Sequence, residues 1–263
     1  MNFLIYVNIA LLCAFIFVLQ RLFWYRSRLH RGKRLTKKHF IAKVPPEKFD
    51  SKFSIQDFGY TRDCEVHFIG RSIDLPGETS DREGFILSVF AKSAKSIFEF
   101  GTCSGKTSYL LARNSPEEAI ITIITLGPDQ LNMYSGMQQI DNSDASESAL
   151  SESIFKRFVY SGSEVESKIV QLFNDSKCFN EKDYIGKCDI IFIDGSHAYS
   201  YVKSDTEKAL KMISEGGVIL WHDYGSNSGA VEGVTKYLHE LSKQLKLFWI
   251  EDTSLIAYRH SKL

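Results

Sequence analysis

Apolar residues along the chain fall into two patterns, short continuous runs and longer stretches with helical spacing. Val231, Val234, Leu238 and Leu241 recur at steps of three and four, which predicts an amphipathic helix that extends to Leu245. Strands that alternate with helices are typical of βαβ units, so we expect an α/β fold with a doubly wound, seven-stranded, Rossmann-like sheet. The seven predicted strands are the short runs at 96–100, 119–126, 168–173, 189–193, 217–221, 247–250 and 255–258.

The first apolar stretch of the chain is too long for a strand. It runs from Phe3 to Leu19, interrupted only by Asn8, and after Gln20 and Arg21 it resumes with the apolar residues 22–25, which include Trp24 and Tyr25. About 20 such residues cross about 30 Å of hydrocarbon. Because positive charges follow the stretch and no small-residue cleavage site does, an uncleaved transmembrane helix is favoured over a signal peptide. Basic residues next to a span stay in the cytoplasm, so we expect a single-pass membrane protein with a cytoplasmic domain; the basic residues are Arg21, Arg26, Arg28, Arg31, Lys33, Arg34, Lys37 and Lys38.

Three regions follow from these patterns. Residues 1–25 are the predicted membrane anchor, residues 26–60 a basic juxtamembrane segment and linker, and residues 61–263 one globular domain. Within that domain the Ser-rich stretch 141–153 has no apolar period and is expected to be a mobile insertion. The last two predicted strands are separated by residues 251–254 only, too few for a crossover, so they should form an antiparallel terminal pair.

Charge and cysteine content exclude several classes of protein. The net charge is zero, yet ten of the 32 basic residues and only one of the 32 acidic residues lie in residues 1–48. The remainder is therefore acidic, which argues against nucleic acid as a partner. The five cysteines contain no CxxC pair, so neither a disulfide framework nor a zinc site is expected.

Polar residues gather where the predicted strands end. Glu99 is followed by the turn Gly101-Thr102-Cys103-Ser104-Gly105, the fourth predicted strand leads into Asp194-Gly195-Ser196-His197, and the fifth into His222-Asp223. In an open parallel sheet, ligands bind beyond the carboxyl ends of the strands, where the strand order reverses. These residues therefore predict one ligand crevice.

The spacing of the glycine turn limits what the ligand can be. A phosphate-binding P-loop needs four residues between its glycines, and here there are three. Cys103 stands where the dinucleotide motif needs its second glycine, which, with the terminal antiparallel pair, disfavours an NAD-type oxidoreductase. Gly101 is expected to let the backbone approach a ligand, so that a side chain there would block binding and leave the fold largely intact.

Three motifs in order resemble the class I S-adenosylmethionine (SAM) dependent O-methyltransferases with an I-D-G-x-H signature, in the catechol O-methyltransferase-like branch. They are Glu-x-Gly-x-x-x-Gly-x-Thr from Glu99, the segment 187–199 followed by Asp205, and the segment 216–224. The resemblance covers residues 83–259 and implies methyl transfer from SAM to a hydroxyl group. It places Asp175 at the adenine amino group and implies this set of cofactor-binding residues: Glu99, Gly101, Thr102, Ser104, Gly105, Asp129, Asp175, Ser176 and Asp194.

Two departures from the family pattern leave alternatives open. Relatives end the second strand with an acid that holds the ribose, but this chain has Gly127 there, so either Asp129 serves or the contact is lost. In catechol-type relatives two acids and an Asn hold a divalent metal. The equivalent residues here are Asp194, Asp223 and Tyr224. Because Tyr is a poor Mg²⁺ ligand beside carboxylates, Mg²⁺ is a candidate that the sequence does not require.

Methyl transfer to a hydroxyl group needs a base, and His and Asp suit that role. Asp194 and His197 are the first candidates, with His222 either catalytic or packed behind them. The resemblance favours a small-molecule or saccharide acceptor, and the predicted anchor suggests that a saccharide acceptor would be lipid-linked. The alternative is a catalytically inactive SAM-binding or structural module at the membrane. The sequence leaves the oligomeric state open, a homo-oligomer included.

Overall fold

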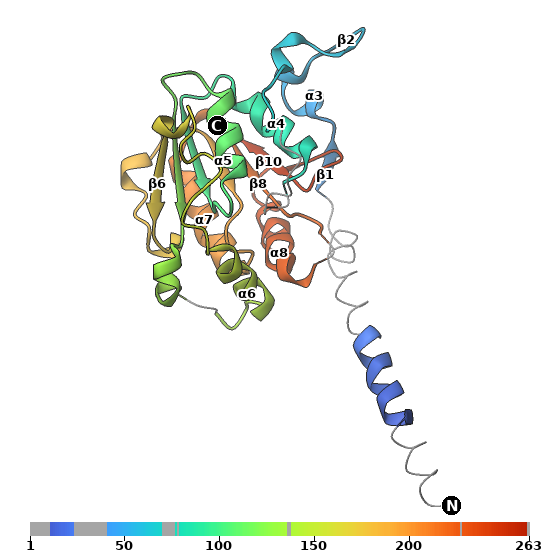
Figure 1. Ribbon diagram of the computed structural model, residues 1–263. Coiled ribbons are helices and arrows are strands. Elements are labelled where there is room, and N and C mark those ends of the chain that lie inside the picture. Colours follow the sequence, from blue (N-terminus) through green and yellow to red (C-terminus); the bar gives the residue numbers. More distant parts are fainter. Residues whose placement is uncertain are drawn as a thin grey trace, which may run out of the picture.

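The computed structural model describes residues 11–23, 41–69, 77, 79–135, 138–226 and 228–261 of the chain (Figure 1). Residues 11–23 form a helix with exposed side chains. Within the described ranges, no helix has both the length and the apolar character that a membrane crossing requires. The rest of the predicted anchor, residues 1–10, 24 and 25, and the basic residues 26–38 lie outside the described ranges.

A single mixed sheet dominates the domain, with the strand order β1-β9-β10-β8-β7-β4-β5-β6. Strands β8, β7, β4, β5 and β6 are parallel, and β10 is antiparallel to both of its neighbours. The predicted Rossmann-like sheet with an antiparallel terminal pair is thereby confirmed. The strands are β1 (Ala42–Val44), β4 (Ser96–Phe100), β5 (Ile120–Thr125), β6 (Ile169–Phe173), β7 (Cys188–Ile193), β8 (Ile213–Trp221), β9 (Phe248–Ile250) and β10 (Ile256–Arg259).

The prediction of seven strands is wrong by one, because the sheet has eight within the described residues. The additional strand β1 lies within the segment that was expected to be a linker and pairs in parallel with β9, Ala42 opposite Phe248. A strand of three residues has no measurable period, which explains why the sequence pattern did not reveal it. A separate hairpin of β2 (Ile55–Gln56) and β3 (Gly59–Tyr60) follows it in the chain.

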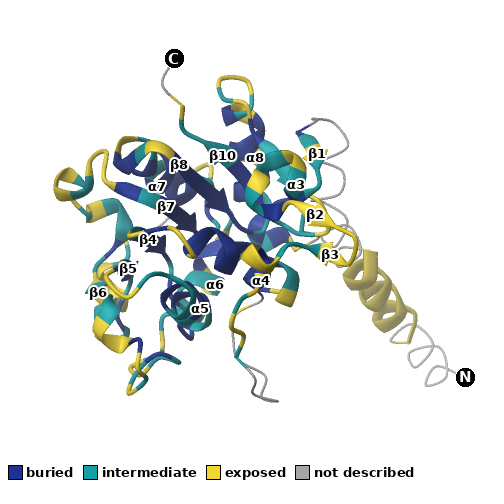
Figure 2. Ribbon diagram, turned by 90° about the horizontal axis from the view of Figure 1, so that it is seen from above, coloured by how far each residue is buried: buried dark blue, intermediate teal, exposed yellow. Residues whose placement is uncertain are grey.

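Helices cover both faces of the sheet and shield its buried strands (Figure 2). One face packs against α4 (Asp81–Ala91) and α5 (Lys106–Asn114), and the other against α7 (Tyr199–Met212) and α8 (Glu232–Leu241). Helix α8 confirms the predicted amphipathic helix, but it ends at Leu241 and does not reach Leu245, because a turn follows at residues 242–244. Shorter helices are α3 (Pro46–Phe49), η1 (Ser51–Phe53), η2 (Arg62–Cys64), η3 (Pro128–Met133), η4 (Glu166–Lys168), η5 (Ser176–Cys178), η6 (Lys182–Tyr184) and η7 (Gly229–Val231).

The Ser-rich stretch expected to be an insertion forms helix α6 (Ser143–Glu152). Asn142 caps its first turn by accepting a hydrogen bond from the Asp144 amide at 3.1 Å. The Asn142 side chain also donates to the carbonyl oxygen of Gly229 at 2.9 Å. The many serines of α6 leave few apolar residues at helical spacing, so the sequence pattern did not reveal the helix. The Asn142 cap and its contact with Gly229 hold α6 in place.

Candidate active site

The site forms where the strand order reverses, between β4 and β7. These strands are parallel neighbours with Phe100 opposite Ile193, and β8 lies on the far side of β7 with Trp221 opposite Ile193. The residues that follow the three strands therefore meet at one edge of the sheet. They are the Gly101–Gly105 turn after β4, Asp194 after β7, and His222 with Asp223 after β8.

The turn after β4 needs glycine for a reason other than ligand access. Gly101 has φ +92°, and a Cβ built on it would lie 2.2 Å from the carbonyl oxygen of Asp194. Gly105 has φ +80°, and a Cβ there would lie 2.9 Å from Phe158 Cβ and 2.9 and 3.0 Å from two ring carbons of Tyr160. The expectation that a side chain at Gly101 spares the fold is therefore wrong, because it would push β4 and β7 apart.

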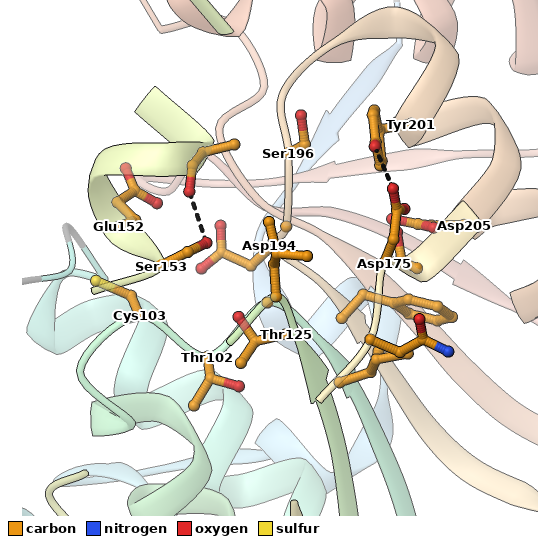
Figure 3. Close-up of a pocket in the computed structure, with 18 of the residues that line it drawn as sticks. Thr102, Cys103, Thr125, Glu152, Ser153, Asp175, Asp194, Ser196, Tyr201 and Asp205 are labelled. Atoms are coloured by element: carbon orange, nitrogen blue, oxygen red, sulfur yellow. Dashed lines mark hydrogen bonds between the residues drawn. The ribbon is translucent and has the colours of Figure 1, made fainter. Parts of the chain in front are cut away.

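Two adjoining cavities open at this edge of the sheet. The first is lined by residues that follow β4, β5, β6 and β7, and Figure 3 shows its side chains. The second encloses about 410 Å³ and extends toward the residues that follow β8. Five residues line both cavities and form what we call the neck: Gly101, Thr102, Cys103, Glu152 and Asp194.

Asp175 organises the far end of the first cavity. Its carboxylate accepts hydrogen bonds from the Lys177 amide at 2.9 Å, the Ser135 amide at 2.6 Å and the Tyr201 hydroxyl at 2.8 Å. Burial alone would raise the pKa of Asp175, but these hydrogen bonds outweigh it and lower the pKa. The Tyr201 ring also stacks on Tyr134, with the ring centroids 4.9 Å apart. This end of the cavity is an aromatic wall beside an ionised acid.

His197 and Asp223 form a close ion pair in the second cavity. His197 Nε2 lies 2.9 Å from Asp223 Oδ2, and both side chains are nearly buried. Burial alone would lower the pKa of His197, but the carboxylates of Asp223, Asp194 and Glu152 raise it to about 9. The imidazole is therefore charged at neutral pH. Asp223 reaches this position from a left-handed backbone conformation (φ 64°), which is uncommon for a residue other than glycine and is concentrated at functional sites.

His222 lies behind this pair and contacts three carboxylates. Its Nδ1 is 3.1 Å from Asp194 Oδ1 and 3.4 Å from Asp223 Oδ1, without a well-aligned hydrogen bond to either. Its Nε2 is 3.3 Å from Glu83 Oε2. Burial opposes the charge on the ring, but the carboxylates outweigh it and raise the pKa of His222 well above its usual range. His222 is thus a buried cation between the acids.

Glu83 reaches this cluster from α4, in the part of the chain before the glycine turn. It closes the capping box of that helix with Ser80, and it also accepts hydrogen bonds from the amide and hydroxyl of Ser254 at 2.7 and 2.8 Å. Burial would raise the pKa of Glu83, but the hydrogen bond and charge of His222 lower it to about 2. The acid is ionised and fixed on all sides.

Glu99 is placed quite differently from Glu83. It is 2% exposed, lines the second cavity, and accepts a hydrogen bond from the Ser108 hydroxyl at 2.6 Å. Burial raises its pKa to about 8 despite this hydrogen bond, and the charge of Asp194 raises it further. Glu99 is therefore mostly protonated at neutral pH in the protein without a ligand.

The structure brings nearly all of the predicted site residues together. Gly105 directly precedes α5 at its N-cap position and lies between lining residues without lining a cavity itself. Asp129 is not brought to the site: it is exposed in η3 and pairs with Lys156 at 3.4 Å, because the chain turns outward after Gly127. The predicted residues that line a cavity are Glu99, Thr102, Ser104, Asp175, Ser176, Asp194, His197, His222, Asp223 and the glycine at 101.

Sequence reasoning missed Glu83, Glu152, Tyr134 and Tyr201. The pattern Ser80-x-x-Glu83 before an apolar run is a readable capping box, but it does not reveal that the same acid meets His222. Glu152 lies in the stretch expected to be an irregular insertion. No spacing rule connects it, or either tyrosine, with the strand ends.

The candidate metal ligands gain a third member. One donor atom each from Asp194, His197 and Asp223 lies within 4.8 Å of the others. Two carboxylates and an imidazole are an acceptable donor set for a divalent cation. Tyr224, which stands where relatives have Asn, is buried instead, and its hydroxyl lies 2.8 Å from His239 Nε2.

Comparison with known proteins agrees with this site. Residues 98–224 match the family model described as a methyltransferase domain. This match shows that the chain carries a methyltransferase domain, and it confirms the enzyme class predicted from the motifs. A search of curated proteins found no relative that matches the chain.

Several solved structures are similar to the chain. The O-methyltransferase TomG of Streptomyces achromogenes, involved in tomaymycin synthesis and solved with SAM, is 18% identical, with a TM-score of 0.48 over 72% of this chain and 83% of that one. An O-methyltransferase of Bacillus cereus, solved with S-adenosylhomocysteine (SAH), is 18% identical, with a TM-score of 0.46 over 72% and 84%. A putative O-methyltransferase of Klebsiella pneumoniae is 15% identical, with a TM-score of 0.47 over 72% and 84%. These likenesses are distant.

Proposed function

We propose that the chain is a membrane-anchored, SAM-dependent O-methyltransferase that methylates a hydroxyl group of a saccharide or a similar polyhydroxylated acceptor. The observation that carries the proposal is the pair of cavities joined at the neck. One is lined by Asp175, the acid that the family resemblance places at the adenine amino group, and the other lies beside a cluster of His and Asp. A methyl donor and a methyl acceptor need such neighbouring compartments with a short path between them.

Unpartnered polar atoms support a cofactor in the first cavity. Thr102 Oγ1 and Asp205 Oδ1 are buried, line this cavity and have no hydrogen-bond partner in the described part of the protein. A buried polar atom without a partner costs free energy, which a bound ligand recovers. Asp175 accepts three hydrogen bonds, which leaves about one of its four lone-pair sites for an adenine amino group, and Glu99 can ionise beside an ammonium group. When bound, SAM supplies an electrophilic methyl group on a sulfonium.

The His and Asp cluster supplies the proton chemistry. Asp194 lines the neck and is placed to accept the proton of an acceptor hydroxyl as that oxygen attacks. The charged His197, paired with Asp223, faces the same cavity and stabilises negative charge on the attacking oxygen. His222 also lines this cavity, but both of its ring nitrogens face carboxylates, so its role is to hold Asp194 and Asp223.

A divalent metal is compatible with the same residues. Asp194, His197 and Asp223 would hold it, and it would lower the pKa of the acceptor hydroxyl. His197 would then act as a neutral ligand, which separates this arrangement from the metal-free one. The two make opposite predictions for a chelator.

The lining of the second cavity favours a polyhydroxylated acceptor. Beyond the His and Asp cluster, most of its polar lining consists of hydroxyl side chains, which bind sugar hydroxyl groups as donors and acceptors at once. They are Thr79, Thr102, Ser104, Thr107, Ser148, Ser151, Ser226 and Ser228. The long apolar stretch at residues 3–25, followed by basic residues, supports an anchor that keeps the domain at the cytoplasmic face, where a lipid-linked acceptor is within reach.

The test measures SAM binding and methyl transfer separately. Calorimetry of the full chain in detergent should show SAM binding, and Asp194→Asn or His197→Ala should lower turnover with a polyhydroxylated acceptor by about 10²- to 10⁴-fold while SAM affinity holds. Loss of activity with EDTA and its return with Mg²⁺ would identify the metal arrangement. SAM binding without turnover on any hydroxylated acceptor would favour the inactive SAM-binding module, and absence of SAM binding would refute the proposal.

A further inference from the structure

We infer that Glu152 recognises the positive sulfonium of the bound methyl donor, and that this acid on α6 makes the site prefer SAM over the neutral thioether product SAH. The inference rests on the proposed function and deepens it. It concerns a residue that neither the motifs nor the matched domain assigns.

The position of Glu152 follows from the two cavities. A donor whose adenosine end lies in the first cavity and whose methyl group must reach the second has to place its sulfur at the neck. Of the five residues at the neck, only Glu152 and Asp194 carry charge. Figure 3 shows Glu152 at the end of α6, near Asp194 and across the cavity from Asp175 and Tyr201.

The other acids around the neck are already compensated. Asp223 is paired with His197, Glu83 is bonded to His222, and Asp194 also lies 3.1 Å from His222. Among the described residues, no lysine, arginine or histidine nitrogen lies within ion-pair distance of Glu152. Glu152 is therefore the neck carboxylate with capacity for a directly contacting cation. Burial raises its pKa and outweighs the attraction of the more distant His197, so its charge is costly until such a cation arrives.

Glu152 is held in place rather than left to swing. The hydroxyl of Ser148, one helical turn earlier, donates to Glu152 Oε1 at 2.9 Å. Helix α6 is fixed at its start, where the Ser146 hydroxyl lies 3.1 Å from the Tyr134 hydroxyl. A second neck atom points to a ligand independently: Thr102 is 6% exposed, and its Oγ1 has no hydrogen-bond partner.

A carboxylate that faces a sulfonium acts on only one of the two cofactor forms. SAM carries a positive charge on sulfur. When the acceptor oxygen takes the methyl group, sulfur keeps the electron pair of the broken bond, so the sulfur of the product SAH is neutral. Removing the charge of Glu152 should therefore weaken SAM and leave SAH unchanged. A desolvated charge pair contributes enough for a loss on the order of tenfold.

The experiment compares the affinities of the full chain for SAM and SAH by calorimetry. Glu152→Gln keeps the shape of the side chain and the acceptor for Ser148. The matched control is Glu147→Gln, which removes the same charge from an exposed position of the same helix. We expect Glu152→Gln to lower SAM affinity about tenfold and SAH affinity less than twofold, with the control unchanged. Glu152→Asp, which keeps the charge, should recover most of the preference for SAM.

Each other result is decisive. Equal losses for SAM and SAH, or no loss at all, overturn the inference while the proposed function stands. An equal effect of Glu147→Gln would also overturn it, because a general change in charge would then be the cause. If the unaltered protein bound neither SAM nor SAH, the proposed function would fail first, and the inference would fall with it.

Discussion

Replacing Gly101 with alanine should destabilise the protein through contact with a neighbouring strand. The φ of +92° costs an L-residue about 1–2 kcal/mol. The new Cβ would also lie 2.2 Å from Asp194 O and 2.7 Å from Gly195 Cα, both backbone atoms that move only with β7. Overpacking of this kind costs about 1–3 kcal/mol. The sum is about 2–5 kcal/mol, a large part of the total stability of about 5–15 kcal/mol of a typical domain.

Substitutions at two other glycines distinguish the cost of the positive φ from the cost of the backbone clash. Gly162 has φ +75° and nothing within 4 Å of a built Cβ, so Gly162→Ala should show the backbone cost alone, about 1–2 kcal/mol. Gly195 has no positive φ and its nearest atoms lie 3.6 Å away, so Gly195→Ala should cost less than about 1 kcal/mol. The order expected in urea unfolding is Gly101, then Gly162, then Gly195. Stabilities of the Gly101 and Gly162 variants within about 1 kcal/mol of each other would refute the argument from backbone contact.

Two further predictions concern acids of the site. Because the pKa of Glu99 is about 8 in the folded protein and 4.5 in the reference state, the folded state keeps a proton that the unfolded state loses, and stability without ligand should fall as pH rises between these values. Urea titrations should show a slope of up to about 1.4 kcal/mol per pH unit that Glu99→Gln removes; an unchanged slope would contradict the assignment. Asp129→Ala should leave SAM affinity within about twofold in calorimetry, because this exposed side chain is away from the cavities; a larger loss would restore it as a ribose ligand.

The sequence predicted the parts of the fold that depend on short-range patterns. The runs around Phe98 and Ile191 are long enough to show as strands, and the short connection after Ile250, five residues in the structure, forces an antiparallel pair. The groups at the strand ends were predictable because a doubly wound sheet brings such ends together. Strand β1 was not, because three residues carry no period, and helix α6 was not, because its surface is mostly serine.

The candidate site was predictable by position but not by charge state. Asp194, His197 and Asp223 were expected to meet, and they do. That His197 is paired and charged, and that His222 lies between Asp194 and an acid on α4, depends on side-chain directions that no linear motif encodes. The prediction that Asp129 contacts the ribose was not met for the same reason, because the turn that begins at Gly127 decides whether the side chain two residues later faces the cavity or the solvent.

The bonds of Glu83 also bear on the order in which the protein is assembled. Glu83 meets His222 139 positions later and Ser254 171 positions later, so the contacts close some of the longest loops in the chain. Contacts of such separation form late, because the entropy of loop closure must be overcome first. During synthesis, the five parallel strands β4 to β8 emerge before Ser254 does. The charge arrangement around His222 is therefore completed only when Ser254 has been made and docked against Glu83, and a nascent chain cannot hold the active arrangement before then.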